Sequence, residues 1–110
     1  MRKAEKLFDD LQEWQEETFP DQTAVGKANH LVAEANELVE AITKYLCSPT
    51  DENYNELKME FADVFLLTQS CAGKLGFNFD DLVNFGIEKL DKCKLKEWSN
   101  LNENGYPHHK

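Results

Sequence analysis

The sequence predicts an all-α protein, built as a four-helix bundle. Apolar residues recur at three- and four-residue spacing through four successive segments, which is the period of a helix with one buried face. Of the three prolines, Pro20 and Pro49 lie between such segments, where a helix must end or begin. No segment shows the strict alternation of apolar and polar residues that is typical of a strand.

The first helix is expected from Arg2 to about Thr18, because a residue that precedes proline, here Phe19, disfavours helical geometry. The second should begin near Thr23, a residue type suited to an N-cap, and run to about Leu46. The expected core faces of these two helices are Ala4, Leu7, Phe8, Leu11 and Trp14 on the first, and Ala28, Leu31, Val32, Ala35, Leu38, Val39, Ile42 and Leu46 on the second.

The third helix is predicted from about Asp51 to Leu75, with Gly76 in the left-handed conformation that commonly ends a helix. The fourth should start near Asn78 and continue to about Trp98. We therefore expect one helical domain, residues 1–99, and a polar C-terminal tail, residues 100–110. The expected core face of the third helix is Leu57, Phe61, Val64, Thr68, Cys71 and Leu75.

Composition excludes several classes of function. A net charge of -9 disfavours nucleic-acid binding through a basic surface. No stretch approaches the roughly 18 consecutive apolar residues that span a bilayer, and the N-terminus lacks the apolar core of a signal peptide. The three cysteines are widely separated and form no Cys-x-x-Cys pair, which favours free thiols in a reducing cytoplasm.

Two acidic pairs stand out, Glu34-x-x-Glu37 and Glu60-x-x-Asp63. The i,i+3 spacing puts each pair on one face of its helix, so two antiparallel helices could bring four carboxylates together. Such a cluster repels itself unless a cation neutralises it, and an all-oxygen ligand set favours Mg²⁺, with Mn²⁺ as the alternative. The competing interpretation is a solvated acidic face for the first pair and a lysine-paired acid at the core edge for Glu60. By helical rotation Glu60 falls inside the apolar arc, where an isolated carboxylate would be costly.

The two acidic pairs on an all-helical chain of this size resemble the signature of a known protein family, and further residues share the likeness. The family is that of the short MazG-like nucleoside triphosphate pyrophosphohydrolases of the dATP/dGTP type. The further residues that resemble it are Trp14 with Phe19-Pro20, His30-Leu31 ahead of Glu34, Ala62-Asp63-Val64, Gly76, Lys89-Leu90, Trp98 and the late His108. The similarity covers about Leu11 to His108. It implies a helical bundle that assembles as a homodimer or homotetramer. It also implies cleavage of (deoxy)nucleoside triphosphates, purine deoxynucleotides among them, into a monophosphate and pyrophosphate.

The resemblance also assigns residues. It implies that Glu34, Glu37, Glu60 and Asp63 hold Mg²⁺, and that a lysine, an asparagine and an arginine follow before the final tryptophan. Lys89 matches the lysine, whereas Cys93 and Lys96 stand where the asparagine and arginine are expected. Lysine cannot reproduce arginine's bidentate fork on phosphate, so the base preference stays open.

Further roles follow as hypotheses. Glu37 is our candidate for the acid that accepts a proton from the attacking water. Lys89 and Lys96 could contact phosphate oxygens or lie on a solvated basic face. Trp14 and Trp98, with Phe19, could stack on the base or pack in a core or interface, and His30 could orient the acids or lie on the surface. The alternative function is a catalytically inactive helical module that regulates a partner.

Overall fold

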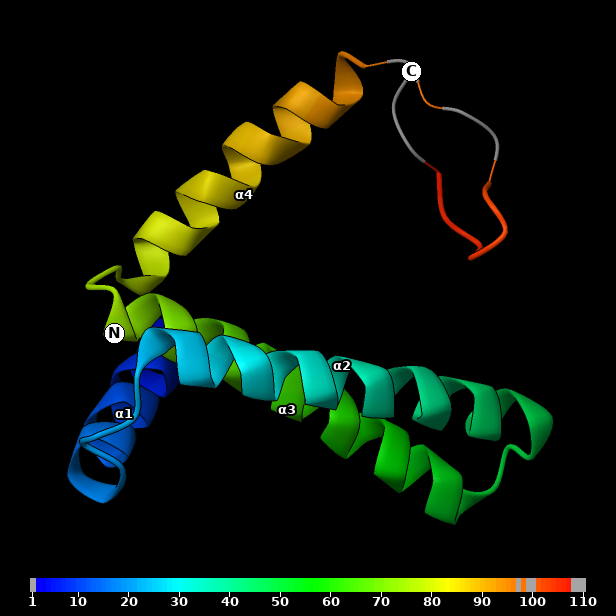
Figure 1. The fold of residues 1–110 in the computed structure, drawn as a ribbon, viewed down its shortest axis with the longest axis horizontal. Helices are drawn as coiled ribbons and strands as arrows, with labels where there is room; N and C mark the ends of the chain where they lie inside the picture. Colours follow the sequence, from blue (N-terminus) through cyan, green and yellow to red (C-terminus); the bar gives the residue numbers. More distant parts are fainter. Residues whose placement is uncertain (1, 97, 99–100, 108–110) are drawn as a thin grey trace. The chain divides into compact units, whose positions relative to one another are not determined.

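The computed structural model describes residues 2–96, 98 and 101–107, and it forms four helices connected by short turns (Figure 1). They are α1 (Lys3–Thr18), α2 (Ala24–Cys47), α3 (Asp51–Lys74) and α4 (Phe79–Lys94). The expected all-α class is confirmed, and no strand forms among these residues. None of the described helices combines the length and the apolar character that a membrane crossing requires. The chain divides into two compact units, Met1–Phe79 and Asp80–Lys110.

Local sequence explains where the helices of the first unit begin and end. The Thr23 hydroxyl accepts from the Gly26 amide at 2.9 Å, and the Thr50 hydroxyl accepts from the Asn53 amide at 3.1 Å. These two N-caps satisfy amides that have no partner within their helices. Gly76 adopts a φ of 89° just after α3, a conformation that glycine tolerates best.

Helix α4 is shorter than the sequence suggested. It ends at Lys94 rather than near Trp98. Its last turn is closed by two hydrogen bonds of the 3₁₀ type, each spanning three residues. They run from the Leu95 amide to the Lys92 carbonyl and from the Lys96 amide to the Cys93 carbonyl. The Trp98 indole then donates to the Cys93 carbonyl at 2.9 Å, so a side chain satisfies a carbonyl that a longer helix would have bonded. His108 and the rest of 108–110 lie outside the described residues.

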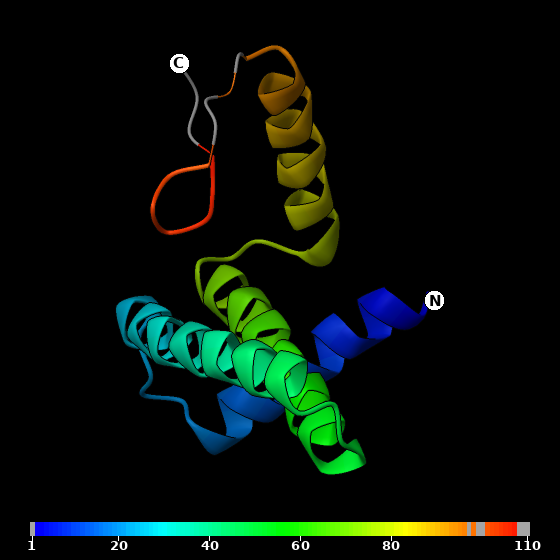
Figure 2. The same ribbon diagram turned by 90° about the vertical axis from the view of Figure 1, so that its right-hand side faces the viewer.

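Helices α2 and α3 form an antiparallel hairpin and lie side by side along most of their length, while α1 crosses α3 (Figure 2). Along this pair, buried and half-buried residues alternate at spacings of three and four, as in a coiled coil. They are Lys27, Leu31, Glu34, Leu38, Ala41 and Tyr45 on α2, and Asn53, Leu57, Glu60, Val64, Leu67, Cys71 and Lys74 on α3.

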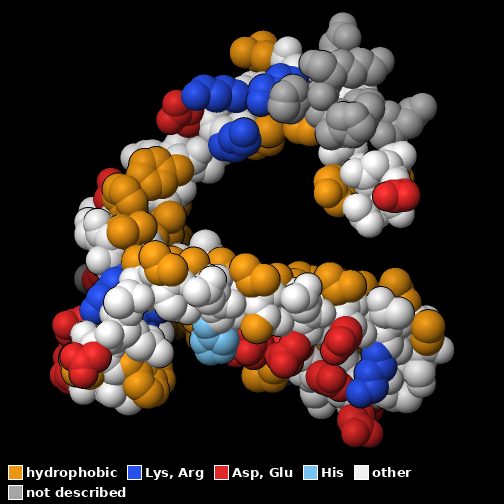
Figure 3. All heavy atoms as spheres, viewed as in Figure 1, with side chains coloured by type: hydrophobic (Ala, Val, Ile, Leu, Met, Phe, Trp, Pro, Cys, Tyr) orange, Lys and Arg blue, Asp and Glu red, His pale blue; other side chains and the backbone are white. Residues whose placement is uncertain are grey.

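Part of the expected core face is exposed. On α2, Val32 and Val39 are each 63% exposed, and on α3 Phe61 is 53% exposed. The apolar stripe is wider than the contact between α2 and α3, so these side chains lie beside the contact rather than in it. Orange side chains accordingly run along one edge of the hairpin in Figure 3. The interpretation of part of the expected core face as core is therefore wrong. The exposed positions are Ala4, Leu7 and Trp14 on α1, Ala28, Val32, Ala35, Val39, Ile42 and Leu46 on α2, and Phe61, Thr68 and Leu75, the last directly after α3.

Candidate metal and nucleotide site

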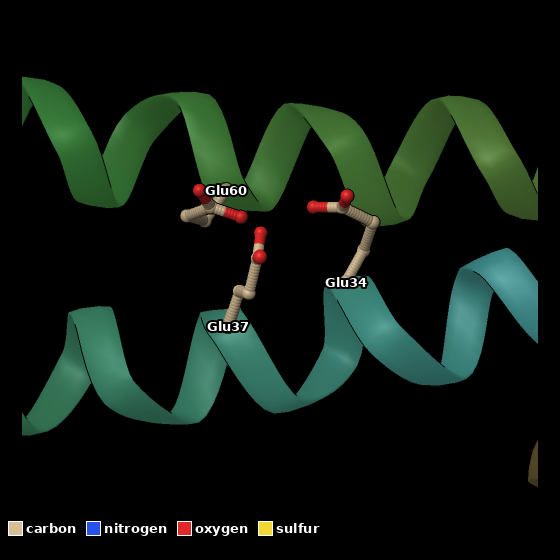
Figure 4. Close-up of side chains that lie close together, drawn as sticks. All are labelled: Glu34, Glu37 and Glu60. Carbon is tan, nitrogen blue, oxygen red and sulfur yellow. The ribbon is translucent and has the colours of Figure 1, made fainter.

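Three carboxylates converge between α2 and α3. Glu34 and Glu37 project from α2 and Glu60 from α3, into the space between the two helices (Figure 4). One oxygen from each of the three lies within 4.8 Å of the others, which is close enough for a shared ion. Three of the four predicted acids thus meet across the antiparallel hairpin, as their spacing predicted.

Two of these acids occupy core positions of the helix pair. Glu34 and Glu60 are among the buried and half-buried residues that recur at spacings of three and four along α2 and α3. The Glu34 side chain is only 16% exposed. Among the described residues, Glu34 Oε2 and Glu60 Oε2 are buried with no hydrogen-bond partner. Buried acceptors without donors are unfavourable, and more so when they are charged. A divalent cation would satisfy both, so this pair of orphaned oxygens fits a metal.

The electrostatics of the cluster agree with its geometry. Contact with the Glu34 carboxylate, then its charge, raises the pKa of Glu37 above the ordinary glutamate value. Burial, then the charges of Glu37 and Glu34, raises the pKa of Glu60. Burial, then the charge of Glu34, also raises the pKa of Asp63. All three acids therefore resist ionisation in the absence of a cation.

Asp63 and His30 both lie against Glu34. Asp63 is not one of the three mutually close acids, although its carboxyl contacts Glu34. His30 Nε2 lies 3.2 Å from Glu34 Oε1, one helical turn away on α2. A histidine at this position can fix the orientation of a carboxylate ligand.

A cavity of about 340 Å³ adjoins the cluster and contains several of the predicted substrate residues. Trp14 and Phe19 pack edge to face on its wall, with ring centroids 5.7 Å apart. A cavity with both aromatic and carboxylate walls can hold a ligand that has an aromatic ring at one end and a metal-bound polyanion at the other. The cavity is lined by Leu11, Trp14, Gln15, Phe19, Gln22, His30, Glu34, Asp63, Leu66 and Leu67.

The predicted residues of the last helix lie in the second unit. Lys89 lines a surface hollow of about 310 Å³ together with Phe85, Glu88 and Lys92. The Lys92 ammonium is 3.1 Å from the Glu88 carboxylate. The proposed phosphate contacts of Lys89 and Lys96, and stacking by Trp98, stay predictions.

A group of polar side chains beside the cavity was not predicted from the sequence: Gln15, Gln22 and the buried Lys27. One signal was available. Lys27 precedes Leu31 by four residues, so it falls in the buried register of α2, where a lysine is unusual.

Comparisons with known proteins place this geometry in context. Residues 7–109 match the family model of the dATP/dGTP pyrophosphohydrolases. Among solved structures, the chain is similar to a cyanophage S-2L MazG-like pyrophosphohydrolase bound to dGDP and three catalytic Mn²⁺ ions per active site. That match has a TM-score of 0.63 and 23% identity, and it covers 100% of this chain and 99% of the other. This likeness confirms the expected MazG-like fold. A search of the curated proteins finds no match.

Proposed function

The chain belongs to the dATP/dGTP pyrophosphohydrolase family and is a nucleoside triphosphate pyrophosphohydrolase, and from this premise we propose that Glu34, Glu37, Glu60 and Asp63 bind Mg²⁺, or Mn²⁺ in its place. The observation that carries the proposal is the pair of buried, partnerless oxygens on Glu34 and Glu60. Divalent metal at the active site of the cyanophage protein supports it. When bound, the cation would neutralise the acids and the charge that develops on the phosphates.

The cavity beside the acids is the proposed nucleotide site. Trp14, with Phe19 behind it, would stack on the base, and His30 would hold Glu34 in place. The dGDP bound by the cyanophage protein supports a purine deoxynucleotide as the substrate. Lys89, Lys96 and Trp98 complete the proposed set of substrate contacts.

The reaction needs a water molecule, an acceptor for its proton and a leaving group. The water oxygen attacks the α-phosphorus, the bond from that phosphorus to the bridging oxygen breaks, and pyrophosphate leaves with the electron pair. We assign the proton to Glu37, the most exposed of the three converging acids. Phosphoryl chemistry of this kind depends mainly on positioning and charge stabilisation, which the rigid hairpin provides.

The test is a panel of deoxynucleoside and ribonucleoside triphosphates assayed for released pyrophosphate. With Mg²⁺ we expect a monophosphate and pyrophosphate from dGTP and dATP, and faster release than from pyrimidine nucleotides. EDTA should stop release, and excess Mg²⁺ or Mn²⁺ should restore it. Full activity in EDTA would refute the metal assignment, and equal rates for all bases would refute the purine preference.

The exposed apolar side chains of the hairpin support assembly as a homodimer or homotetramer. Val32, Val39 and Phe61 would be covered by a second copy, which explains their apolar character at high exposure. Sedimentation at micromolar concentration should show a dimer or tetramer, and Val39→Glu should shift the species toward the monomer because it introduces a charge into the contact. A monomeric wild type would contradict the assembly.

A further inference from the structure

Lys27 is a buried cation held by two glutamines. Its side chain is 4% exposed, and its ammonium lies 2.8 Å from Gln22 Oε1 and 3.2 Å from Gln15 Oε1. Among the described residues, no carboxylate forms an ion pair with it. A buried ammonium whose hydrogen bonds all go to amides is rare, because amides compensate for less of its lost hydration than a carboxylate does. The charges of Lys74, Cys71 and Glu16 also act on Lys27.

The Lys27 ammonium determines the orientation of the side-chain amides of Gln15 and Gln22. An ammonium can only donate, so each glutamine must turn its oxygen toward Lys27. For Gln15 the arrangement is anchored twice, because the fully buried Ser70 hydroxyl also donates to Gln15 Oε1. Both lone pairs of that oxygen are thereby engaged. The amide nitrogens of Gln15 and Gln22 have no partner among the described residues, so both remain available as donors, while Gln22 Oε1, which accepts only from Lys27, keeps one lone pair.

Both glutamines line the cavity that also contains Trp14 and Glu34. We propose that Lys27 is a positioning residue that fixes Gln15 and Gln22 as hydrogen-bond donors in the nucleotide cavity, and so makes the site prefer a base with two adjacent acceptors. This inference rests on the proposed function, since it specifies which base edge the cavity reads. Lys27 itself need not touch the nucleotide.

The purines differ in the edge that such donors would meet. Guanine presents two adjacent acceptors, O6 and N7, whereas adenine presents the acceptor N7 beside the donor N6 amino group. Two fixed amide donors therefore match guanine and place one donor against another in adenine. Freely rotating glutamines would not discriminate in this way, because either amide could turn its oxygen toward N6.

Gln15→Glu and Gln22→Glu separate recognition from folding. Each keeps an oxygen for Lys27, and the contact becomes an ion pair, so the melting temperature should not fall. Each replaces the free NH₂ donor by an acceptor. We expect the ratio of kcat/KM for dGTP over dATP to fall about tenfold or more, mainly through KM for dGTP. Thr18→Glu, which adds the same charge to the exposed end of α1 outside the cavity, should leave the ratio unchanged.

Lys27→Met tests the positioning role directly. Without the ammonium Gln22 can rotate, and Gln15 keeps only the Ser70 hydroxyl, which can donate or accept and so permits either orientation of the amide. The dGTP over dATP ratio should therefore move toward unity while kcat for dATP changes little. The matched control is Lys74→Met, which removes a lysine that pairs with Glu16 at 3.6 Å and does not line the nucleotide cavity. It should keep the ratio of the wild type.

Calorimetric titration with dGMP and dAMP in Mg²⁺ gives a readout that does not need turnover. The wild type should bind dGMP more tightly, and Gln15→Glu should lose this preference. If the folded Gln15→Glu protein keeps the wild-type preference, or if the wild type prefers dAMP, the inference is wrong even with pyrophosphate release intact. If no nucleotide is hydrolysed but the base preference and its loss are observed, the proposed function fails and the donor assignment stands.

Discussion

Glu60→Gln should reduce pyrophosphate release by more than the roughly 10- to 100-fold that follows loss of an indirect metal partner, because it removes a direct ligand. The amide is nearly isosteric with the carboxylate, so packing between α2 and α3 should survive. The same change should raise the melting temperature in EDTA, since it removes a buried carboxylate that has no partner for Oε2 and that repels Glu37 and Glu34. Steady-state assays and thermal melts with and without Mg²⁺ check the two effects together.

Glu52→Gln is the matched control, because Glu52 is an exposed acid in the first turn of the same helix. It removes one negative charge from α3 without touching the cluster, and its activity should equal that of the wild type. Undiminished turnover by Glu60→Gln would show that the converging acids are not the metal site. Loss of activity in both variants would point to net charge rather than to ligation.

The metal-free protein should become more stable as the pH falls from neutral toward the ordinary carboxyl values, which are 4.5 for glutamate and 3.8 for aspartate. The folded pKa values of Glu37, Glu60 and Asp63 are raised, so in this window the folded state binds more protons than the unfolded state. The free energy of unfolding therefore falls as the pH rises through the folded pKa values. Melting temperatures in EDTA across this range measure the effect.

Saturating Mg²⁺ should abolish or reverse this pH dependence, because a bound cation favours the ionised carboxylates and stabilises the folded state by mass action. Glu60→Gln should show a smaller gain on acidification in EDTA than Glu52→Gln, which separates the cluster from the general relief of net negative charge. A wild-type melting temperature that does not rise on acidification in EDTA would contradict the raised pKa values.

The sequence was sufficient for the number and order of the helices and for the convergence of three of the four acids. Helical spacing, caps such as Thr23 and breakers such as Gly76 act locally, so they can be read without knowing the tertiary structure. The position of Glu60 inside an apolar arc was likewise a local signal, and its oxygen is indeed buried. The dATP/dGTP pyrophosphohydrolase resemblance was confirmed by the family model.

The sequence could not show which residues of each apolar stripe are buried between the helices. Val32 and Val39 have the same periodicity as Leu31 and Leu38, yet only the latter pair is partly covered by α3. The polar group around Lys27 was missed for a related reason. Gln15 comes from α1 and Ser70 from α3, so only the crossing of the helices brings them together.

The connection between α2 and α3, residues 48–50, is short. The convergence of the acids therefore depends on the number of residues between the two acidic pairs. Each inserted residue turns the following part of a helix by about 100°, so one extra residue between Glu37 and the connection would swing Glu34 and Glu37 away from Glu60. Such a protein would retain every acid and still lack their convergence. We expect the stretch between Glu34 and Asp63 to have a constant number of residues in active relatives.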